Sequence, residues 1–126
     1  MKLRCTANSI RLRVRKSDLD VLENQGEVSA PINFAPGIKL EYVLKLGQVE
    51  QPQARYSAHQ ISVILPVELA EKWINSEDVS IEYQQAYAEG QYLQVLIEKD
   101  FPCRHTEEKD LQDTFFELAP KDDLSC

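Results

Sequence analysis

Five basic side chains near the start of the chain have the types and spacing of an anion-binding surface. Basic and apolar residues alternate over residues 2–5 and again over residues 10–15. Because the side chains of a strand point alternately to its two faces, all the basic ones would share one face of a hairpin. The other face would then be buried, with Leu3, Cys5, Ile10, Leu12 and Val14. The predicted site consists of Lys2, Arg4, Arg11, Arg13 and Arg15. Arginine binds phosphate and carboxylate groups through paired N–H donors, so we expect an anionic ligand or an acidic protein surface as partner.

The same residues have a plainer interpretation as an ordinary solvated strand face. Acidic residues on neighbouring strands, such as Glu41 or Glu82, would then offset part of the charge, and exposed ion pairs of this kind contribute little to stability. Nucleic acid is a less favoured partner, because aromatic residues do not interleave with the basic ones and the sequence pI is about 4.8.

A thiol and an imidazole lie close together at Cys103 and His105. In an extended segment this spacing puts both on one side, where they can bind a metal or act as nucleophile and base. A complete ligand set would need distant residues, so the two are weak metal candidates and neither metal nor cofactor is predicted.

The sequence contains no glycine-rich phosphate loop, no G-x-S-x-G elbow and no H-E-x-x-H motif. A non-enzymatic binding module is therefore favoured. The alternative is an enzyme that holds a phosphorylated or anionic small molecule on the basic face, with carboxylates such as Glu98 and Asp100 as acid, base or metal ligands.

Charge is distributed unevenly along the chain, which has a net charge of −7. Residues 1–16 contribute +6, whereas residues 17–99 contribute −8 and residues 100–126 contribute −5. We predict one domain over residues 1–101, made of two related halves at about 1–47 and 54–101, and an acidic C-terminal tail over residues 102–126. The tail mixes acidic and apolar residues, so it either covers part of the basic face or is simply solvated.

Cysteine usage and the absence of an apolar leader indicate a cytoplasmic protein. The three cysteines are an odd number without C-x-x-C spacing, which favours free thiols over a disulfide framework. No stretch resembles a signal peptide or a membrane-spanning helix, so no membrane partner is expected.

Two similar phrases 51 residues apart indicate how the chain positions the basic face. TANSIRLRVR, residues 6–15, and SAHQISVILP, residues 57–66, both read as a turn followed by an alternating strand. In this alignment His59 takes the place of the turn residue Asn8. Strand candidates EVSAPINF and IKLEYVLKL follow in the first half, with Pro31 predicting an edge strand, and SIEYQQAY and YLQVLIEKDF follow in the second. The constant offset pairs Val28 with Val79 and Ser29 with Ser80.

A short helix is predicted in each half. The first spans about residues 18–25, with Ser17 as cap, Asp20 as the acid of a capping box and Gly26 as terminator. The second begins near Pro66, with Leu69 and Trp73 on one buried face.

The predicted fold class is α+β, mostly antiparallel, with an internal duplication in which strand, strand, helix, strand, strand occurs twice. A strand followed by a short helix cannot bury its apolar side alone, so two copies would pack around a common core and could close into a small barrel. The alternative is that alternation and capping make two unrelated segments look alike.

The phrases NSIRLRVRKSDLDVL, ISVILPVELAEKW and EKDFPC together resemble a family of short bacterial proteins that has no assigned function. The resemblance covers roughly residues 1–103. The tail of that family tends to end in aromatic-Pro-Asn-Pro, whereas this chain reads TFFELAP, so no role of the tail is carried over. Separately, the strand-then-helix phrase is similar to the half-unit of AbrB-type transcription factors, and that likeness implies an alternative function as a DNA-binding dimer with swapped hairpins.

Overall fold

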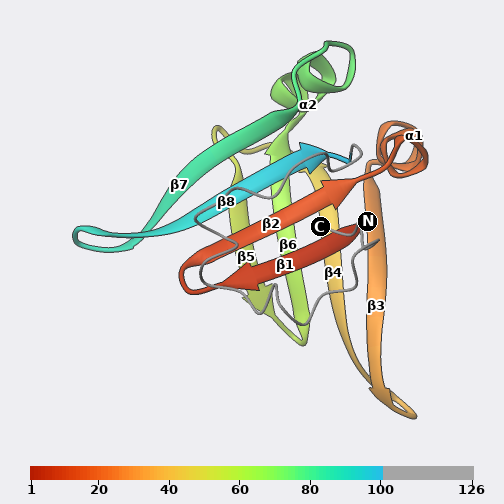
Figure 1. Ribbon diagram of the computed structural model, residues 1–126, viewed down its shortest axis with the longest axis vertical. Helices are drawn as coiled ribbons and strands as arrows, with labels where there is room; N and C mark the ends of the chain where they lie inside the picture. The colour runs from red at the N-terminus through yellow and green to blue at the C-terminus, as the bar shows by residue number, and fades with distance from the viewer. Residues whose placement is uncertain (101–126) are drawn as a thin grey trace, which may run out of the picture.

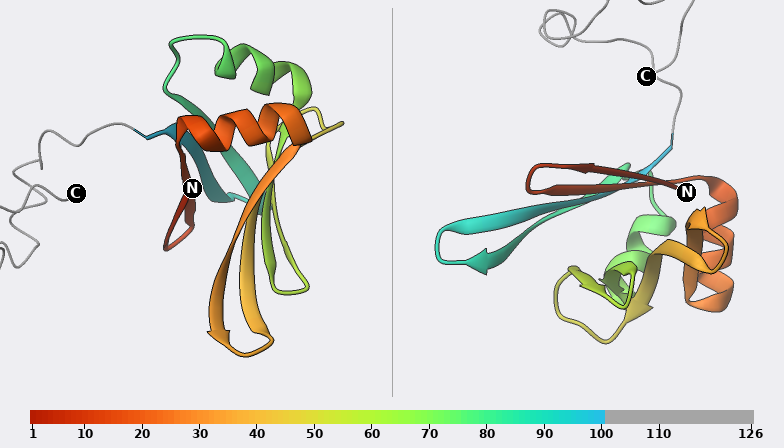
Figure 2. Two further views of the ribbon diagram at one scale, coloured as in Figure 1. Left: turned by 90° about the vertical axis from the view of Figure 1, so that its right-hand side faces the viewer. Right: turned by 90° about the horizontal axis from the view of Figure 1, so that it is seen from below.

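The chain forms two four-stranded sheets with two short helices at one end of the molecule (Figures 1 and 2). A computed structural model describes residues 1–100. The first half contains β1 (Lys2–Thr6), β2 (Ser9–Val14), α1 (Lys16–Gln25), β3 (Glu27–Ala35) and β4 (Ile38–Gly47). The second half contains β5 (Gln53–Ser57), β6 (Gln60–Pro66), α2 (Val67–Ile74), β7 (Ser80–Ala88) and β8 (Gln91–Lys99). The α+β class and the twofold occurrence of the element order are thus confirmed.

Each sheet combines one hairpin from each half. Sheet A has the order β1-β2-β8-β7 and sheet B has the order β3-β4-β6-β5. The central pairs β2–β8 and β4–β6 are parallel, and all other pairs are antiparallel. The predicted barrel is wrong, because within residues 1–100 each sheet ends in two edge strands and the two sheets stay separate.

The registers of the two sheets are equivalent, which lets their positions be compared one by one. Arg13 lies between Lys2 and Glu98 in sheet A, as Ile64 lies between Gln53 and Lys45 in sheet B. Strands β1–β2 and β5–β6 keep the offset of 51 seen in the sequence, from Lys2 to Gln53.

After the helices the offset changes to 53, from Glu27 to Ser80. Val28 therefore corresponds to Ile81, and its predicted pairing with Val79 is wrong. The reason is that the linker from α2 to β7, residues 75–79, has five residues where Gly26 alone connects α1 to β3, while α2 has 8 residues and α1 has 10. The longer linker and the shorter helix together add two residues. An origin of the two halves by duplication stays a prediction.

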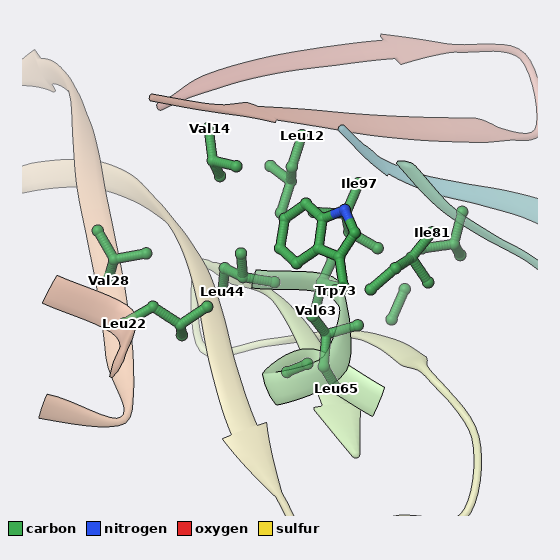
Figure 3. Packing of buried hydrophobic residues seen from close by; sticks show 13 residues of the cluster. Leu12, Val14, Leu22, Val28, Leu44, Val63, Leu65, Trp73, Ile81 and Ile97 are labelled. Carbon is green, nitrogen blue, oxygen red and sulfur yellow. The ribbon is translucent and has the colours of Figure 1, made fainter. Parts of the chain in front are cut away.

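The core lies between the inner faces of the two sheets and the two helices. Figure 3 shows the Trp73 ring of α2 among side chains from both sheets, including Leu12, Ile97 and Leu44. Leu22 of α1 is the equivalent of Trp73 and is fully buried. Full burial of a large apolar side chain contributes about 1.5–3 kcal/mol, so these positions carry much of the stability of the fold.

The first hairpin forms as predicted, with one exception. Its turn places Asn8 at φ 58°, and the equivalent turn places His59 at φ 61°, which confirms that both are turn residues. Leu12 and Val14 are buried as expected, but Cys5 is exposed. Cys5 lies near the turn on edge strand β1, away from the helices that cover the core. Edge strand β3 contains Pro31, as predicted.

Helix α1 begins earlier than predicted. Its N-cap residue is Arg15, whose backbone N–H donates a hydrogen bond of 2.8 Å to Asp18 Oδ2. The capping acid is therefore Asp18 instead of Asp20, and Ser17 lies inside the helix. Gly26 ends the helix as predicted, with φ 80° and a 2.8 Å hydrogen bond from its N–H to Leu22 O.

Helix α2 follows directly from Pro66, its N-cap residue. It buries Ala70 and Trp73, which lie three residues apart. The prediction that Leu69 shares the buried face is wrong, because Leu69 is 37% exposed.

Candidate anion-binding face

Four of the five predicted basic residues lie on the outer face of β1 and β2, and we call this set the cationic face. Leu12 and Val14 point into the core, so the alternate residues of β2 point away from it. The register of the hairpin sets Lys2 opposite Arg13 and Arg4 opposite Arg11. The cationic face consists of Lys2, Arg4, Arg11 and Arg13.

Arg15 is placed elsewhere. It is exposed, but it follows the last residue of β2 and serves as the N-cap of α1. The strand ends one residue before Arg15, so Arg15 is not counted in the cationic face, and its part in anion binding stays a prediction.

The cationic face opposes like charges across a strand pair. Cations directly opposite one another in an antiparallel pair are destabilising, by roughly 0.2–1 kcal/mol for each pair. Two such pairs occur side by side in the first hairpin. The equivalent hairpin of sheet B has none, because Gln53 faces Ile64 and Arg55 faces Ser62. Folding therefore does not require cations at these positions.

Glu98 supplies an internal counter-charge. It lies on β8, directly beside Arg13 of the parallel strand β2, and its residue is only 8% exposed. Arg13 Nε donates a hydrogen bond of 2.6 Å to Glu98 Oε1, and Arg11 Nε lies 3.7 Å from the same oxygen. Asp100 directly follows β8, and its Oδ1 lies 3.9 Å from Arg13 Nη1. From the neighbouring strand β8, the carboxylate of Glu98 thus orients both arginines of β2.

Lys2 and Arg4 lie farther from these acids, on the edge strand. Both are exposed, and their side chains border a hollow of about 140 Å³ together with Leu3, Arg11 and Arg13. A carboxylate or phosphate in this hollow would find ammonium and guanidinium donors from two strands, which is the donor set that binds such groups.

The acidic residues expected to offset the cationic face do not do so. Glu41 lies in sheet B, where its carboxylate is 3.7 Å from Lys39 Nζ. Glu82 lies in sheet A on β7, with Leu96 of β8 between it and Arg11. The real partner, Glu98, was named from the sequence only as a candidate acid or base. Its pairing with Arg13 joins strands 85 positions apart in the chain, and no local pattern indicates such a contact.

The described part of the chain has no metal-binding cluster and no membrane-spanning helix. Residues 1–100 contain no cluster of three or more His, Cys, Asp or Glu side chains suited to a metal ion. The weak metal candidates Cys103 and His105 lie outside the described residues. Neither of the two helices is long and apolar enough to cross a membrane.

These features define an α+β protein with two mixed sheets, one of which carries a cationic outer face. The chain belongs to a family of unknown function, DUF7009, whose family model matches residues 1–118. Searches of curated proteins and of solved structures find no match. The bacterial family and the AbrB likeness expected from the sequence stay predictions.

Proposed function

We propose that the protein is a non-enzymatic binding module whose cationic face binds an acidic protein surface. The observation that carries this proposal is the pair of like-charge oppositions in the first hairpin, Lys2 with Arg13 and Arg4 with Arg11. An anionic partner would convert these repulsions into attractions, whereas folding gains nothing from them. The equivalent hairpin of sheet B folds in the same way without them.

The buried position of Glu98 supports binding over catalysis. A general acid or base must release and accept a proton near a substrate, but this carboxylate is held by Arg13 at 2.6 Å. Its observed contacts are those of a group that fixes arginine side chains in place. The role as acid or base therefore has less support than the role as an internal counter-ion.

The acidic tail is the proposed internal competitor for the cationic face. It lies outside the described residues, but the described chain ends beside that face. Asp100 N–H donates a 2.8 Å hydrogen bond to Val14 O at the end of β2. The described chain therefore ends next to the strand that carries Arg11 and Arg13. The sequence after it includes the acids Glu107, Glu108, Asp110, Asp113 and Glu117.

A binding assay on the full chain tests the proposal. Fluorescent polyglutamate and a duplex DNA of equal charge would be titrated at about 50 mM and about 200 mM salt. We expect polyglutamate to bind more tightly, and the double variant Arg4→Gln with Arg11→Gln to bind it on the order of tenfold more weakly. Neutralising the five tail acids is expected to strengthen binding.

A matched control removes the same charge from sheet B, with Arg55→Gln, at the position equivalent to Arg4, and Lys39→Gln. Both of these side chains are exposed, so the folded structure should persist. If this control weakens binding as much as the sheet A variant, the cationic face is not the site. Tighter binding of duplex DNA than of polyglutamate would replace the proposal with the DNA-binding alternative.

A further inference from the structure

The free edge of β1 lies next to the cationic face and differs from its counterpart in sheet B. Within residues 1–100, strands β1 and β5 are equivalent edge strands, each paired on one side only. In an antiparallel hairpin the backbone N–H and C=O groups of alternate residues point away from the partner strand. The backbone N–H and C=O groups of Ala54 on β5 point away from β6 in this way. The equivalent position on β1 is Leu3.

The edge of β5 is closed at Ala54 by a side-chain amide. Gln85 of β7 accepts a 2.7 Å hydrogen bond from Ala54 N–H through Oε1, and it donates a 2.9 Å hydrogen bond to Ala54 O through Nε2. These two bonds reproduce what one residue of an added strand would make. The side chain of Gln85 thus occupies the place of a neighbouring backbone.

Among the described residues, no side chain closes the edge of β1 at Leu3 in this way. The position equivalent to Gln85 is Ile32, whose side chain has neither donor nor acceptor. Tyr42 Oη donates a 3.0 Å hydrogen bond to the backbone oxygen of Met1, two residues before Leu3. This bond occupies an acceptor at the start of the edge but does not involve Leu3 itself. Within residues 1–100, the outward backbone groups of Leu3 and Cys5 bond to no other residue, so two N–H and two C=O groups remain available.

From this contrast we propose that β1 accepts an extended acidic segment of a partner protein as a fifth strand of sheet A. The proposal rests on the function proposed above and specifies how the acidic partner binds. Backbone pairing with Leu3 and Cys5 would set the segment beside β1, and its alternate side chains would lie opposite Lys2 and Arg4 on the outer face.

Charge selects the occupant of this edge. A second copy of β1 would set its own cations against Lys2 and Arg4, and basic side chains on an edge strand are a common protection against such self-pairing. The same side chains attract glutamate or aspartate at alternate positions. The partner segment is therefore one in which acidic residues alternate with small or apolar ones.

The test uses the full chain and an eight-residue peptide, acetyl-Glu-Val-Glu-Thr-Glu-Val-Glu-Thr-amide. Two further peptides carry backbone N-methyl groups, one on its glutamates and the other on its valines and threonines. All three have the same charge, but only one set of N–H groups can face β1 in a strand pair. We expect one methylated peptide to bind like the parent and the other to bind on the order of tenfold more weakly.

Amide hydrogen exchange locates the peptide on the protein. The parent peptide is expected to slow the exchange of the Leu3 and Cys5 amides, and to leave that of Ala54 unchanged because Gln85 already bonds it. Slow exchange of Leu3 and Cys5 in the full chain alone would mean that another segment of the chain already fills the edge, which would overturn the proposal.

The outcomes separate this inference from the proposed function. If both methylated peptides bind like the parent while Arg4→Gln with Arg11→Gln weakens all three, the cationic face binds acids without strand addition, and only the inference is wrong. If the double variant has no effect on any of the peptides, the proposed function is wrong and the inference is wrong with it.

Discussion

Sheets A and B have the same strand order and equivalent registers, yet their outer faces differ in chemistry. On the central strands of sheet A, Arg13 contacts the buried Glu98. At the equivalent positions of sheet B, Ile64 is buried and lies beside Lys45. The inner faces, in contrast, are apolar in both sheets because they enclose one core. The core therefore restricts the residue types on only one face of each sheet. The residues on the outer face are free to differ between the sheets and can serve binding.

The largest expected effect concerns the two helices that cover the shared core. Trp73→Ala should lower the free energy of unfolding by about 3–5 kcal/mol, and Leu22→Ala at the equivalent position by about 2–5 kcal/mol. Both should shift one common transition, because each sheet contains a hairpin from each half. Urea unfolding followed by far-ultraviolet circular dichroism measures both values.

Leu69→Ala serves as the control for the helix experiment, since Leu69 is on α2 but is exposed. It should change the free energy of unfolding by no more than about 0.5 kcal/mol. Two separate transitions, one shifted by Leu22→Ala and the other by Trp73→Ala, would show that the halves fold independently. That result would contradict an architecture in which each sheet takes one hairpin from each half.

An intermediate effect is expected on the outer face of sheet A. Glu98→Gln removes the charge that holds Arg13 and leaves Arg11 and Arg13 to repel one another. Because the pair is largely buried, we expect a loss of about 1.5–3 kcal/mol in the free energy of unfolding. Lys45→Gln, at the equivalent position of sheet B, should change it by no more than about 0.5 kcal/mol, since Lys45 lies beside an apolar residue. Equal losses in the two variants would mean that the outer faces do not differ in this respect.

The sequence predicted the local structure well because local patterns determine it. Alternation placed Leu12 and Val14 in the core and Arg11 and Arg13 outside it, the turn residues Asn8 and His59 were identified, and Gly26 ended α1.

What could not be predicted depends on contacts between distant segments. The parallel pairing of β2 with β8 brings Glu98 to Arg13, and the amide of Gln85 reaches Ala54 of another sheet. Neither contact has a local signature. The helix cap was misassigned for a different reason. Ser17 and Asp20 match the capping-box pattern in the sequence, whereas the Arg15 side chain has no acceptor, and only the position at which β2 ends makes Arg15 the N-cap.

The smallest expected effect distinguishes the starts of the two helices. Asp18 accepts a hydrogen bond from Arg15 N–H and lies 3.0 Å from the N-terminal ammonium of Met1. The equivalent residue of α2 is Leu69, and its N-cap Pro66 has no N–H to donate. Asp18→Asn should therefore lower the free energy of unfolding by about 0.5–2 kcal/mol at neutral pH, whereas Leu69→Asn should leave it nearly unchanged.

The pH dependence of this effect follows from the charge of Asp18. Burial raises the pKa of its carboxyl group, but the hydrogen bond from Arg15 N–H and the N-terminal ammonium outweigh burial and hold the pKa below its ordinary value of 3.8. The folded state thus favours the ionised form, so the stabilisation is fully present above pH 3.8 and is lost as the pH falls through the lower value of the folded state. The difference between the wild type and Asp18→Asn, measured by urea unfolding from neutral pH downward, should shrink in that acid range. A difference that stays constant down to the lowest pH would mean that Asp18 stabilises α1 by packing and not by its charge.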